Sequence, residues 1–238
     1  MNKIDVNCDV GEGLNNEAEL MPYIQSCNIA CGGHAGSEKI MRNIVLLAKK
    51  YHVKIGAHPS YPDKENFGRK TMILDPDELK RTIQKQINSL LQIIKEQGAT
   101  MNHIKPHGAL YNDIAKNNEL SLEFLDAIMP YKNEVKLYVP YNSAIEKNAL
   151  KNGFSIVYEA FADRNYNDVL SLVSREEKEA LITNPKKILQ HVSEMVTTEK
   201  VTTVTGKKVP IKANTFCVHS DTENAIEIVK VLYHHNFL

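Results

Sequence analysis

The residues best suited to chemistry near the start of the chain lie between Asp5 and Gly13. This segment begins as a short alternating strand and breaks at a glycine, so Asn7, Asp9 and Glu12 fall where the strand ends. Polar groups crowded at a strand end lose hydration and need a proton, a cation or a substrate as a partner. A capped turn would use the same residue types. The segment therefore has two interpretations, a turn and part of a functional site.

Similar side chains follow at least five further apolar segments, which favours the functional interpretation. They are His34, His58, Lys105 with His107, Asp163 with Arg164, and His219 with Asp221. Lys105 could neutralise a carboxylate or an oxyanion, and His107 could transfer a proton. A solvated lysine beside a turn histidine is the alternative. The intervening Pro106 and the following Gly108 restrain the backbone there, which favours a functional pair.

Asp9, His34 and His58 form one candidate metal set. A carboxylate and two imidazoles from successive strands could hold Zn²⁺ or a similar ion and leave a position open for water. The spacing matches no metal motif, because the chain has neither HExxH nor a CxxC pair. The same residues could instead act as general base and acid around a small substrate. Histidines that are hydrogen-bonded without a metal are a third interpretation.

Arginines and the last predicted strand supply candidates for binding a substrate. Arg164 could pair with its neighbour Asp163 or clamp a substrate carboxylate through two hydrogen bonds. Arg69 lies in a glycine-containing loop that could reach the site, although its position alone favours the surface. His219 and Asp221 would face the same side of a straight strand, or hydrogen-bond to each other in a loop. The other histidines lie away from strand ends and receive no chemical role: His52, His103, His191, His234 and His235.

Seven short apolar segments, alternating with helical segments, must position these residues. The predicted strands are Lys3–Asp9, Cys27–Cys31, His52–Ala57, Met101–Lys105, Val135–Val139, Ser155–Ala160 and Thr215–His219. Predicted helices include one that follows Ser37, one from Asp75 to Gln97, one near Asn184–Val196 and one near Asn224–His234; a hairpin is predicted within Val201–Ala213. Strands that alternate with helices predict a parallel sheet with the helices outside.

Two parallel layouts are compatible with this alternation. An open sheet gathers ligand-binding groups mainly at one crevice. A barrel gathers the carboxyl end of every strand around one mouth. Because the candidate residues follow strands from the first to the last, the sequence predicts an α/β fold of the (β/α)7 barrel type. We expect a single domain over residues 1–238.

Composition and missing motifs exclude several function classes. Lys plus Arg number 29 and Asp plus Glu number 29, so no basic excess is available for binding nucleic acid. No apolar run reaches membrane-spanning length, and the N-terminus lacks the apolar stretch of a secretory signal. Four scattered cysteines suit reduced thiols, which predicts a cytoplasmic protein. The serine-hydrolase elbow, the P-loop and the dinucleotide-binding fingerprint are absent.

Seven blocks of the sequence resemble signature blocks of the LamB/YcsF family. They are Asp5–Glu12, Asn28–Gly36, Ile55–Asp63, Asn66–Arg69, Lys105–Asn112, Phe161–Arg164 and Cys217–His219. The blocks occur in the family's order, so the resemblance covers essentially the whole chain. It implies a distorted (β/α)7 barrel resembling the glycoside hydrolase/deacetylase superfamily, which agrees with the strand count.

The resemblance also implies an activity, the ATP-dependent opening of the lactam of 5-oxo-L-proline to L-glutamate together with two partner subunits, B and C. Asp9, His34 and His58 would activate water or bind a divalent metal. Lys105 and His107 would stabilise charge and transfer a proton. The substrate-binding residues would be Asn7, Glu12, Arg69, Asp163, Arg164 and His219. ATP is expected to arrive with Mg²⁺, and a homo-oligomer is compatible with the resemblance. Lacking a P-loop, the chain must bind ATP differently or leave part of that work to a partner.

Three positions depart from the family's pattern. Gly33 stands where phenylalanine is expected, Ser37 where aspartate is usual, and Ser220 where glycine is expected. These departures concern the shape of the pocket more than the reaction. Two alternative functions stay open at this point: a metal-dependent hydrolase like the deacetylases and glycosidases, and a non-catalytic substrate-binding subunit.

Overall fold

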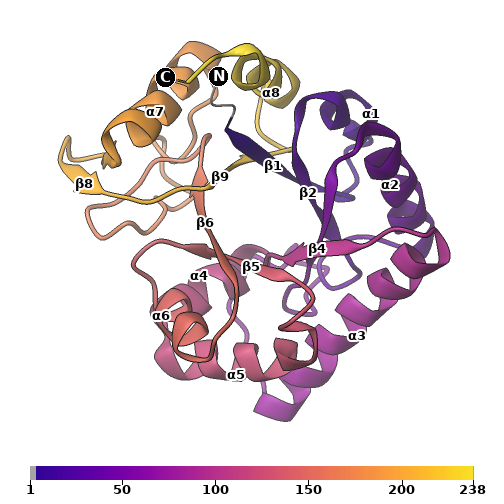
Figure 1. The fold of residues 1–238 in the computed structure, drawn as a ribbon. Coiled ribbons are helices and arrows are strands. Elements are labelled where there is room, and N and C mark those ends of the chain that lie inside the picture. Colours follow the sequence, from indigo (N-terminus) through magenta and orange to yellow (C-terminus); the bar gives the residue numbers. More distant parts are fainter. Residues whose placement is uncertain (1–3, 238) are drawn as a thin grey trace.

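A closed barrel of parallel strands forms the centre of the molecule (Figure 1). The computed structural model describes residues 4–237. Around the barrel the strands are β1 (Asp5–Val10), β2 (Ser26–Ala30), β3 (Lys54–His58), β4 (Met101–Ile104), β5 (Lys136–Pro140), β6 (Ile156–Phe161) and β9 (Thr215–His219). β1 pairs in parallel with both β2 and β9, which closes the barrel. The predicted α/β barrel is confirmed, while the predicted strand start at Lys3 lies outside the described residues.

Helices surround the strands in Figure 1. They are α1 (Glu17–Leu20), α2 (Glu38–Tyr51), α3 (Pro76–Glu96), α4 (Gly108–Lys116), α5 (Asn118–Ile128), α6 (Ala144–Lys151), α7 (Pro185–Thr198) and α8 (Ala225–His234), with 3-10 turns at Met21–Tyr23 and Met129–Tyr131. Three helices begin with side-chain caps: Ser37, Asp75 and Asn184 each accept a backbone N–H from the first turn of their helix. The predicted hairpin is β7 (Lys200–Thr202) paired with β8 (Lys208–Pro210).

The third strand begins two residues later than the sequence predicts. His52, expected to open the strand, instead ends α2 in the left-handed conformation with φ of 57°. Its N–H donates to the carbonyl of Lys49 at 3.3 Å, so it belongs to the helix end. The strand runs from Lys54 to His58. This places the His58 imidazole at the carboxyl end of β3, where the barrel opens.

A polar network occupies the barrel interior beside β1 and β2. An ideal Cβ on Gly56 would lie 2.1 Å from His103 Nε2, so the glycine leaves room for that ring inside the barrel. His103 stacks on Tyr138 and its Nε2 lies 2.7 Å from Asn28 Oδ1. Because the amide oxygen only accepts, Nε2 carries the proton. Asn28 Nδ2 in turn donates to Asp9 Oδ1 at 2.8 Å, which fixes the orientation of that carboxylate.

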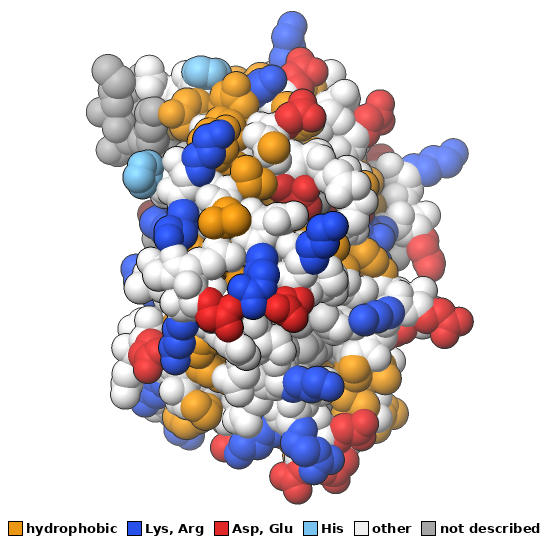
Figure 2. Space-filling model, turned by 90° about the vertical axis from the view of Figure 1, so that its right-hand side faces the viewer, with side chains coloured by type: hydrophobic (Ala, Val, Ile, Leu, Met, Phe, Trp, Pro, Cys, Tyr) orange, Lys and Arg blue, Asp and Glu red, His pale blue; other side chains and the backbone are white. Residues whose placement is uncertain are grey.

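The longest helix shows how the outer layer attaches to the barrel. α3 buries one stripe, which consists of Leu79, Ile83, Ile87, Leu90, Ile93 and Ile94. Burying side chains of this size contributes about 1.5–3 kcal/mol each. On the face of the molecule that carries α2 and α3, basic and acidic side chains are interspersed (Figure 2). Within residues 4–237, no helix has the length and apolarity needed to cross a membrane.

Candidate active site

The carboxyl ends of the barrel strands surround a cavity of about 630 Å³. Its wall includes most of the residues predicted from the sequence, namely Asp9, Glu12, His58, Arg69, Lys105, His107, Arg164 and His219. The parallel register explains the gathering, because Asp9 on β1 pairs with Asn28 on β2 and with His219 on β9. Asn7 lies one pleat deeper and is fully buried; its Oδ1 accepts from Asn28 at 2.7 Å. Asn7 therefore supports the floor of the cavity rather than facing a ligand.

Lys105 forms the charged floor of the cavity. Its Nζ donates to Asp9 Oδ1 at 2.9 Å and to Cys217 Sγ at 3.0 Å, and it lies 2.9 Å from Glu159 Oε1. Burial alone would lower the pKa of this ammonium, but Asp9, Cys217 and Glu159 together hold it well above its usual range. Burial likewise opposes the charge on Asp9, but His58 and Lys105 hold the pKa of Asp9 well below its usual range. The floor is therefore an ionised ammonium–carboxylate pair.

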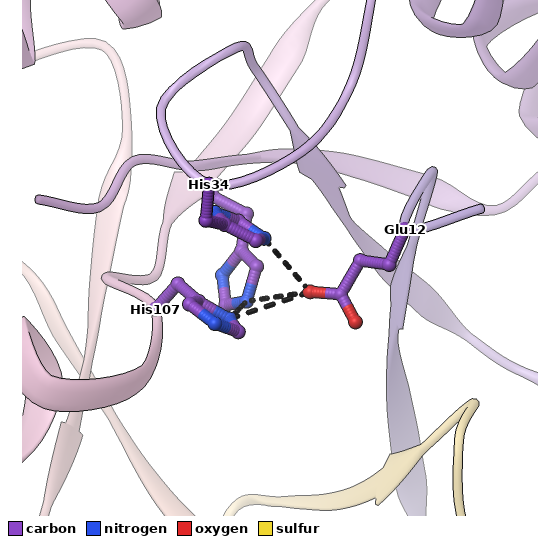
Figure 3. Close-up of side chains that lie close together, drawn as sticks. Glu12, His34 and His107 are labelled. Carbon is purple, nitrogen blue, oxygen red and sulfur yellow. Dashed lines mark hydrogen bonds and ion pairs between the residues drawn. The ribbon is translucent and has the colours of Figure 1, made fainter. Parts of the chain in front are cut away.

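Glu12 and three imidazoles form a second group at the cavity, which we call the Glu12 cluster (Figure 3). Glu12 Oε1 lies 2.9 Å from His34 Nε2, 3.3 Å from His107 Nδ1 and 3.8 Å from His58 Nε2. The rings of His34 and His107 stack with centroids 3.6 Å apart, and His58 stands nearly perpendicular to both. Burial lowers the pKa of His34 and lowers that of His107 further, which favours their neutral forms.

The outward-facing nitrogens of two of these rings donate to backbone carbonyls. His58 Nδ1 donates to the Lys105 carbonyl at 2.7 Å, and His107 Nε2 donates to the Phe67 carbonyl at 3.0 Å. A carbonyl only accepts, so these nitrogens carry the ring protons. In the neutral ring of His107, Nδ1 then holds a lone pair. It faces His58 Nε2 at 3.0 Å, and His58 Nε2 also lies 3.3 Å from Asp9 Oδ2.

The third ring, that of His34, also donates one ring N–H away from Glu12. His34 Nδ1 lies 3.0 Å from Ser60 Oγ, whose hydroxyl proton is already donated to the Tyr61 carbonyl at 2.8 Å. His34 therefore donates through Nδ1 and turns the lone pair of Nε2 toward Glu12. The Glu12 cluster thus brings together two imidazole lone pairs, on His34 and His107, and a carboxylate oxygen, with His58 Nε2 as the one ring nitrogen still able to donate to them. Acceptors at such distances repel one another unless a proton or a cation lies between them.

The Glu12 cluster differs from the predicted metal set. Four candidate ligand atoms, from Glu12, His34, His58 and His107, lie within 4.8 Å of one another; Asp9 belongs to a separate group with Cys217 and His219. Because the His34 and His107 rings are stacked at an interplanar angle of 3°, their lone pairs run side by side. Both could bind one ion only if a ring turned. His58, at 84° to 85° to the other two, needs no such rotation.

On the opposite side of the mouth, both carboxylate oxygens of Asp163 have hydrogen-bond partners. It accepts from the His219 backbone N–H at 2.8 Å and from Thr222 Oγ1 at 2.5 Å, and His219 Nδ1 lies 3.0 Å away. We call Asp163, His219 and Thr222 the Asp163 cluster. Burial would raise the pKa of Asp163, but His219 and Thr222 outweigh it and lower that pKa. The Asp163 cluster is thus a closed network.

The arginines are engaged differently from the sequence-based expectations. Arg164 donates to the carbonyls of Val173 at 2.5 Å and Ala180 at 3.3 Å, and no ion pair joins it to Asp163 among the described residues. Arg69 instead pairs with Asp221 at 2.6 Å, and its side chain is 41% exposed at the cavity. Arg164 therefore holds the loop that follows β6, whereas Arg69 keeps donors available for a ligand.

Three functional-looking residues escaped the sequence reasoning. Glu159 is the second carboxylate beside Lys105, Asn28 orients Asp9, and His103 supports Asn28. A charged residue inside the apolar strand Ile156–Phe161 was a signal for Glu159, since parallel strands are usually apolar throughout. Asn28 gave a similar but weaker signal within β2. His103 gave none, because its role depends on the space at Gly56.

The structure accommodates the three unusual positions. An ideal Cβ on Gly33 would lie 2.3 Å from Gln86 Oε1 and from Ser60 Oγ, so these side chains occupy the space beside the glycine. Ser37 Oγ caps α2 by accepting from the Ile40 N–H. The backbone carbonyl of Ser220 accepts a hydrogen bond from the side chain of Asn16, just before α1. The three departures concern side chains near the site, and the barrel is closed.

Fold and site together define an α/β barrel whose mouth joins a buried lysine–carboxylate floor to a carboxylate–imidazole cluster. The model of the LamB/YcsF family matches residues 4–236, and the chain belongs to this family. The chain is 40% identical over 235 residues to a protein of Clostridium beijerinckii named as the A subunit of 5-oxoprolinase, covering 97% of this chain and 92% of that one. A Thermococcus sibiricus protein of the same name is 42% identical over 236 residues, with 97% and 92% covered.

A solved structure shows the same architecture. The Lactam Utilization Protein from Thermus thermophilus superposes with a TM-score of 0.90 at 33% identity, covering 98% of this chain and 95% of that one. A putative cellobiose-phosphate cleavage protein from Enterococcus faecalis V583 is similar in fold, with a TM-score of 0.59 at 14% identity and 99% and 92% of the chains covered.

Proposed function

We propose that this chain is the A subunit of ATP-dependent 5-oxoprolinase, which opens the lactam of 5-oxo-L-proline to L-glutamate with hydrolysis of ATP. It would act together with 5-oxoprolinase subunits B and C. The observation that carries the proposal is the near-complete alignment with relatives named as the A subunit of 5-oxoprolinase, at 40% and 42% identity. The cavity at the barrel mouth supports it, because it combines proton acceptors, a fixed cation and an accessible guanidinium.

The reaction needs ATP because a five-membered lactam is a stable amide, and an enzyme changes rates rather than equilibria. In the proposed route the amide oxygen attacks the γ-phosphorus of ATP and ADP leaves. Water then adds to the activated carbon and gives up a proton to a base. The C–N bond of the tetrahedral intermediate then breaks and the ring nitrogen takes up a proton, which leaves γ-glutamyl phosphate. A second water hydrolyses this acyl phosphate to glutamate and phosphate.

The Glu12 cluster is the proposed base for the attacking water. Acceptors outnumber donors among the facing atoms of Glu12, His34, His58 and His107, so a proton from water would relieve the repulsion between them. A divalent metal held by Glu12, His58 and one of the two stacked rings would instead activate water by lowering its pKa. In either case the carbonyl and hydroxyl partners on the far side of each ring hold the imidazoles in place.

The floor and the exposed guanidinium have separate proposed roles. Lys105, kept charged by Asp9 and Glu159, would stabilise negative charge on the lactam oxygen or on the transferred phosphoryl group. Arg69 would bind the carboxylate of 5-oxo-L-proline. The hydrogen bonds of Arg164, Asp163 and His219 support the walls around that substrate. As part of the same proposal, the chain forms one domain and works in the cytoplasm with its buried cysteines reduced.

A reconstitution assay tests the proposal. The purified chain, alone or with the B and C subunits, is incubated with 5-oxo-L-proline and Mg-ATP while glutamate and ADP are both measured. The expected result is coupled formation of both products only when all three subunits are present. Tightly coupled turnover by this chain alone would contradict the dependence on partners. Failure of the complete set to open the lactam would contradict the function.

One alternative has its own supporting observation. The Glu12 cluster offers the donors of a metal-dependent hydrolase that needs no ATP. Metal analysis of the purified chain, with chelator sensitivity of an ATP-independent hydrolysis, separates this alternative. A binding-only role is separated by Asp9→Asn and His58→Ala, which should still bind 5-oxo-L-proline but abolish turnover if the chain is catalytic.

A further inference from the structure

A second cavity of about 520 Å³ adjoins the first. The two cavities share one stretch of wall, which consists of Tyr111, Asn112, Lys116, Phe161, Ser171 and Leu172. One side of the second cavity is α4, where Tyr111 and Ala115 lie four residues apart on one helix face. The other sides are the end of β6 and the loop after it. A ligand larger than 5-oxo-L-proline can therefore extend from one cavity into the other.

Two buried polar groups lie at the second cavity, and the ion pair of Glu159 Oε1 with Lys105 Nζ at 2.9 Å leaves hydrogen-bonding capacity on both. They are the carboxylate of Glu159, which is 1% exposed, and the hydroxyl of Tyr111, which is 5% exposed. Burial, and then the charge of Glu159, raises the pKa of Tyr111 well above its usual range, so the hydroxyl keeps its proton. A ligand with an N–H or O–H donor would give Glu159 a further partner at Oε2, and a ligand acceptor could take the Tyr111 hydroxyl proton.

The walls of the second cavity suit a flat, uncharged ring. Tyr111 and Phe161 meet edge to face with centroids 5.7 Å apart, and Tyr166 is fixed because its hydroxyl accepts from the Phe161 N–H at 2.8 Å. Aliphatic side chains of the loop, including Leu170 and Leu172, complete the apolar lining. Aromatic and aliphatic walls with a few polar groups are typical of sites for planar heterocycles.

The charges of the two cavities are distributed differently. The first is lined by five cationic side chains, which are Arg69, Lys105, Lys116, Arg164 and Arg175, and by the carboxylates of Asp9, Glu12, Glu176 and Glu177. The second has only Lys116, on the shared wall, and Glu159 as charged lining residues among those described. A ligand that spans both cavities would therefore have a neutral ring with amino donors at one end and several negative charges at the other.

We propose that the second cavity binds the adenine and ribose of ATP and that the triphosphate passes Lys116 into the first cavity. This inference rests on the proposed function, because it places the nucleotide of that reaction on this chain rather than on a partner subunit. Glu159 would accept from the exocyclic amino group, and the aromatic walls would contact the faces of the base. The γ-phosphorus would then lie on the side of the 5-oxo-L-proline oxygen.

Binding and photolabelling of the isolated chain test the proposal without relying on turnover. ATP and uncharged adenosine are titrated by equilibrium dialysis, and 8-azidoadenosine triphosphate is cross-linked and mapped by mass spectrometry. We expect ATP-protected labelling in residues 108–116, 140–143 or 166–172. Ala115→Trp, which fills the second cavity, should weaken binding of both ligands at least about tenfold. The control Ala18→Trp, an exposed alanine on α1, should leave binding unchanged.

A second, smaller substitution separates a loss of ATP binding from a loss of folding. Tyr111→Phe keeps the ring and removes only the hydroxyl, so it should weaken ATP binding about two- to tenfold with an unchanged circular dichroism spectrum. Labelling outside those segments, or equal affinities for Ala115→Trp and Ala18→Trp, would overturn the proposal. If only the B or C partner is labelled while the complex still opens 5-oxo-L-proline, the nucleotide site is elsewhere and the proposed function stands.

Discussion

The two sides of the barrel mouth use similar residue types in opposite ways. In the Asp163 cluster, one carboxylate meets two donors and an imidazole, so each buried oxygen is satisfied. In the Glu12 cluster, a carboxylate meets three imidazoles, each of which directs one ring N–H away to a carbonyl or to a serine. A carboxylate beside a histidine therefore says little about function on its own. What distinguishes the two clusters is whether donors and acceptors balance.

Because of this difference, the two clusters should contribute to the stability of the fold in opposite directions. A balanced network stabilises the fold and loses stability when one member changes. A network with surplus acceptors costs stability and persists because something else, a proton, a cation or a substrate, completes it. The Asp163 cluster thus supports the wall, and the Glu12 cluster is the place where chemistry is expected. The same isosteric change, carboxylate to carboxamide, should have opposite effects on the two sides.

The largest expected effect is on the activity of Glu12→Gln. The amide cannot act as a base and carries no negative charge for a cation, so the opening of 5-oxo-L-proline by the reconstituted enzyme should fall about 10²- to 10⁴-fold. The free energy of unfolding should stay equal or rise, because the new N–H can donate to His34 Nε2, 2.9 Å from the present oxygen. Glutamate formation and urea unfolding measure the two effects. Glu38→Gln, on the exposed start of α2, is the control, and activity retained in Glu12→Gln would refute the assignment.

The next largest effect is on stability, at the floor between the two sides. Lys105→Met leaves Asp9 and Glu159 buried without their cation, which should lower the free energy of unfolding by about 3–5 kcal/mol. Lys80→Met is the matched control, since it removes an exposed ion pair with Asp126 and should change stability little. Equal urea midpoints for the two variants would show that the floor is not an ionised pair.

Asp163→Asn should then show the opposite behaviour to Glu12→Gln. The new amide N–H₂ would face the His219 N–H or the Thr222 hydroxyl, leaving two donors opposed, and the free energy of unfolding should fall by about 1–3 kcal/mol. Activity should fall far less than in Glu12→Gln, because the carboxylate oxygens of Asp163 are already satisfied by donors. Thermal unfolding and the glutamate assay check both statements. A larger activity loss than in Glu12→Gln would reverse the comparison.

The sequence predicted where the site lies better than how it is connected. Apolar alternation and glycine breaks located the strand ends, and a parallel barrel necessarily brings the ends at Asp9, His58 and Lys105 to one mouth. Hydrogen-bond partners depend on side-chain positions that no periodicity encodes. Arg164 illustrates this, since its donors reach the carbonyls of the following loop only because that loop folds back. The second carboxylate beside Lys105 comes from β6, far away in sequence.

The smallest expected effect is on how the free energy of unfolding depends on pH. This dependence should also differ between the two sides of the barrel mouth. Burial lowers the pKa of three histidines on the β1–β4 side, which are His34, His103 and His107, and of His191 on α7. The native state therefore binds fewer protons than the unfolded chain, whose histidines titrate near about 6.5. Stability is greatest above that pH and falls as the pH drops through it, by up to about 1.4 kcal/mol per pH unit for each histidine.

The carboxylates act in a lower pH window. The pKa of Asp163 is lowered in the native state, so its contribution is present above the unfolded value of about 3.9 and is lost only as the pH falls below it. Urea unfolding between about pH 8 and 3 should therefore show two slopes. His103→Gln should flatten the slope near about pH 6 and leave the acid limb, whereas Asp163→Asn should do the reverse. A single variant that flattened both limbs would mean that the two sides of the mouth titrate as one network, and the distinction between balanced and unbalanced clusters would no longer hold.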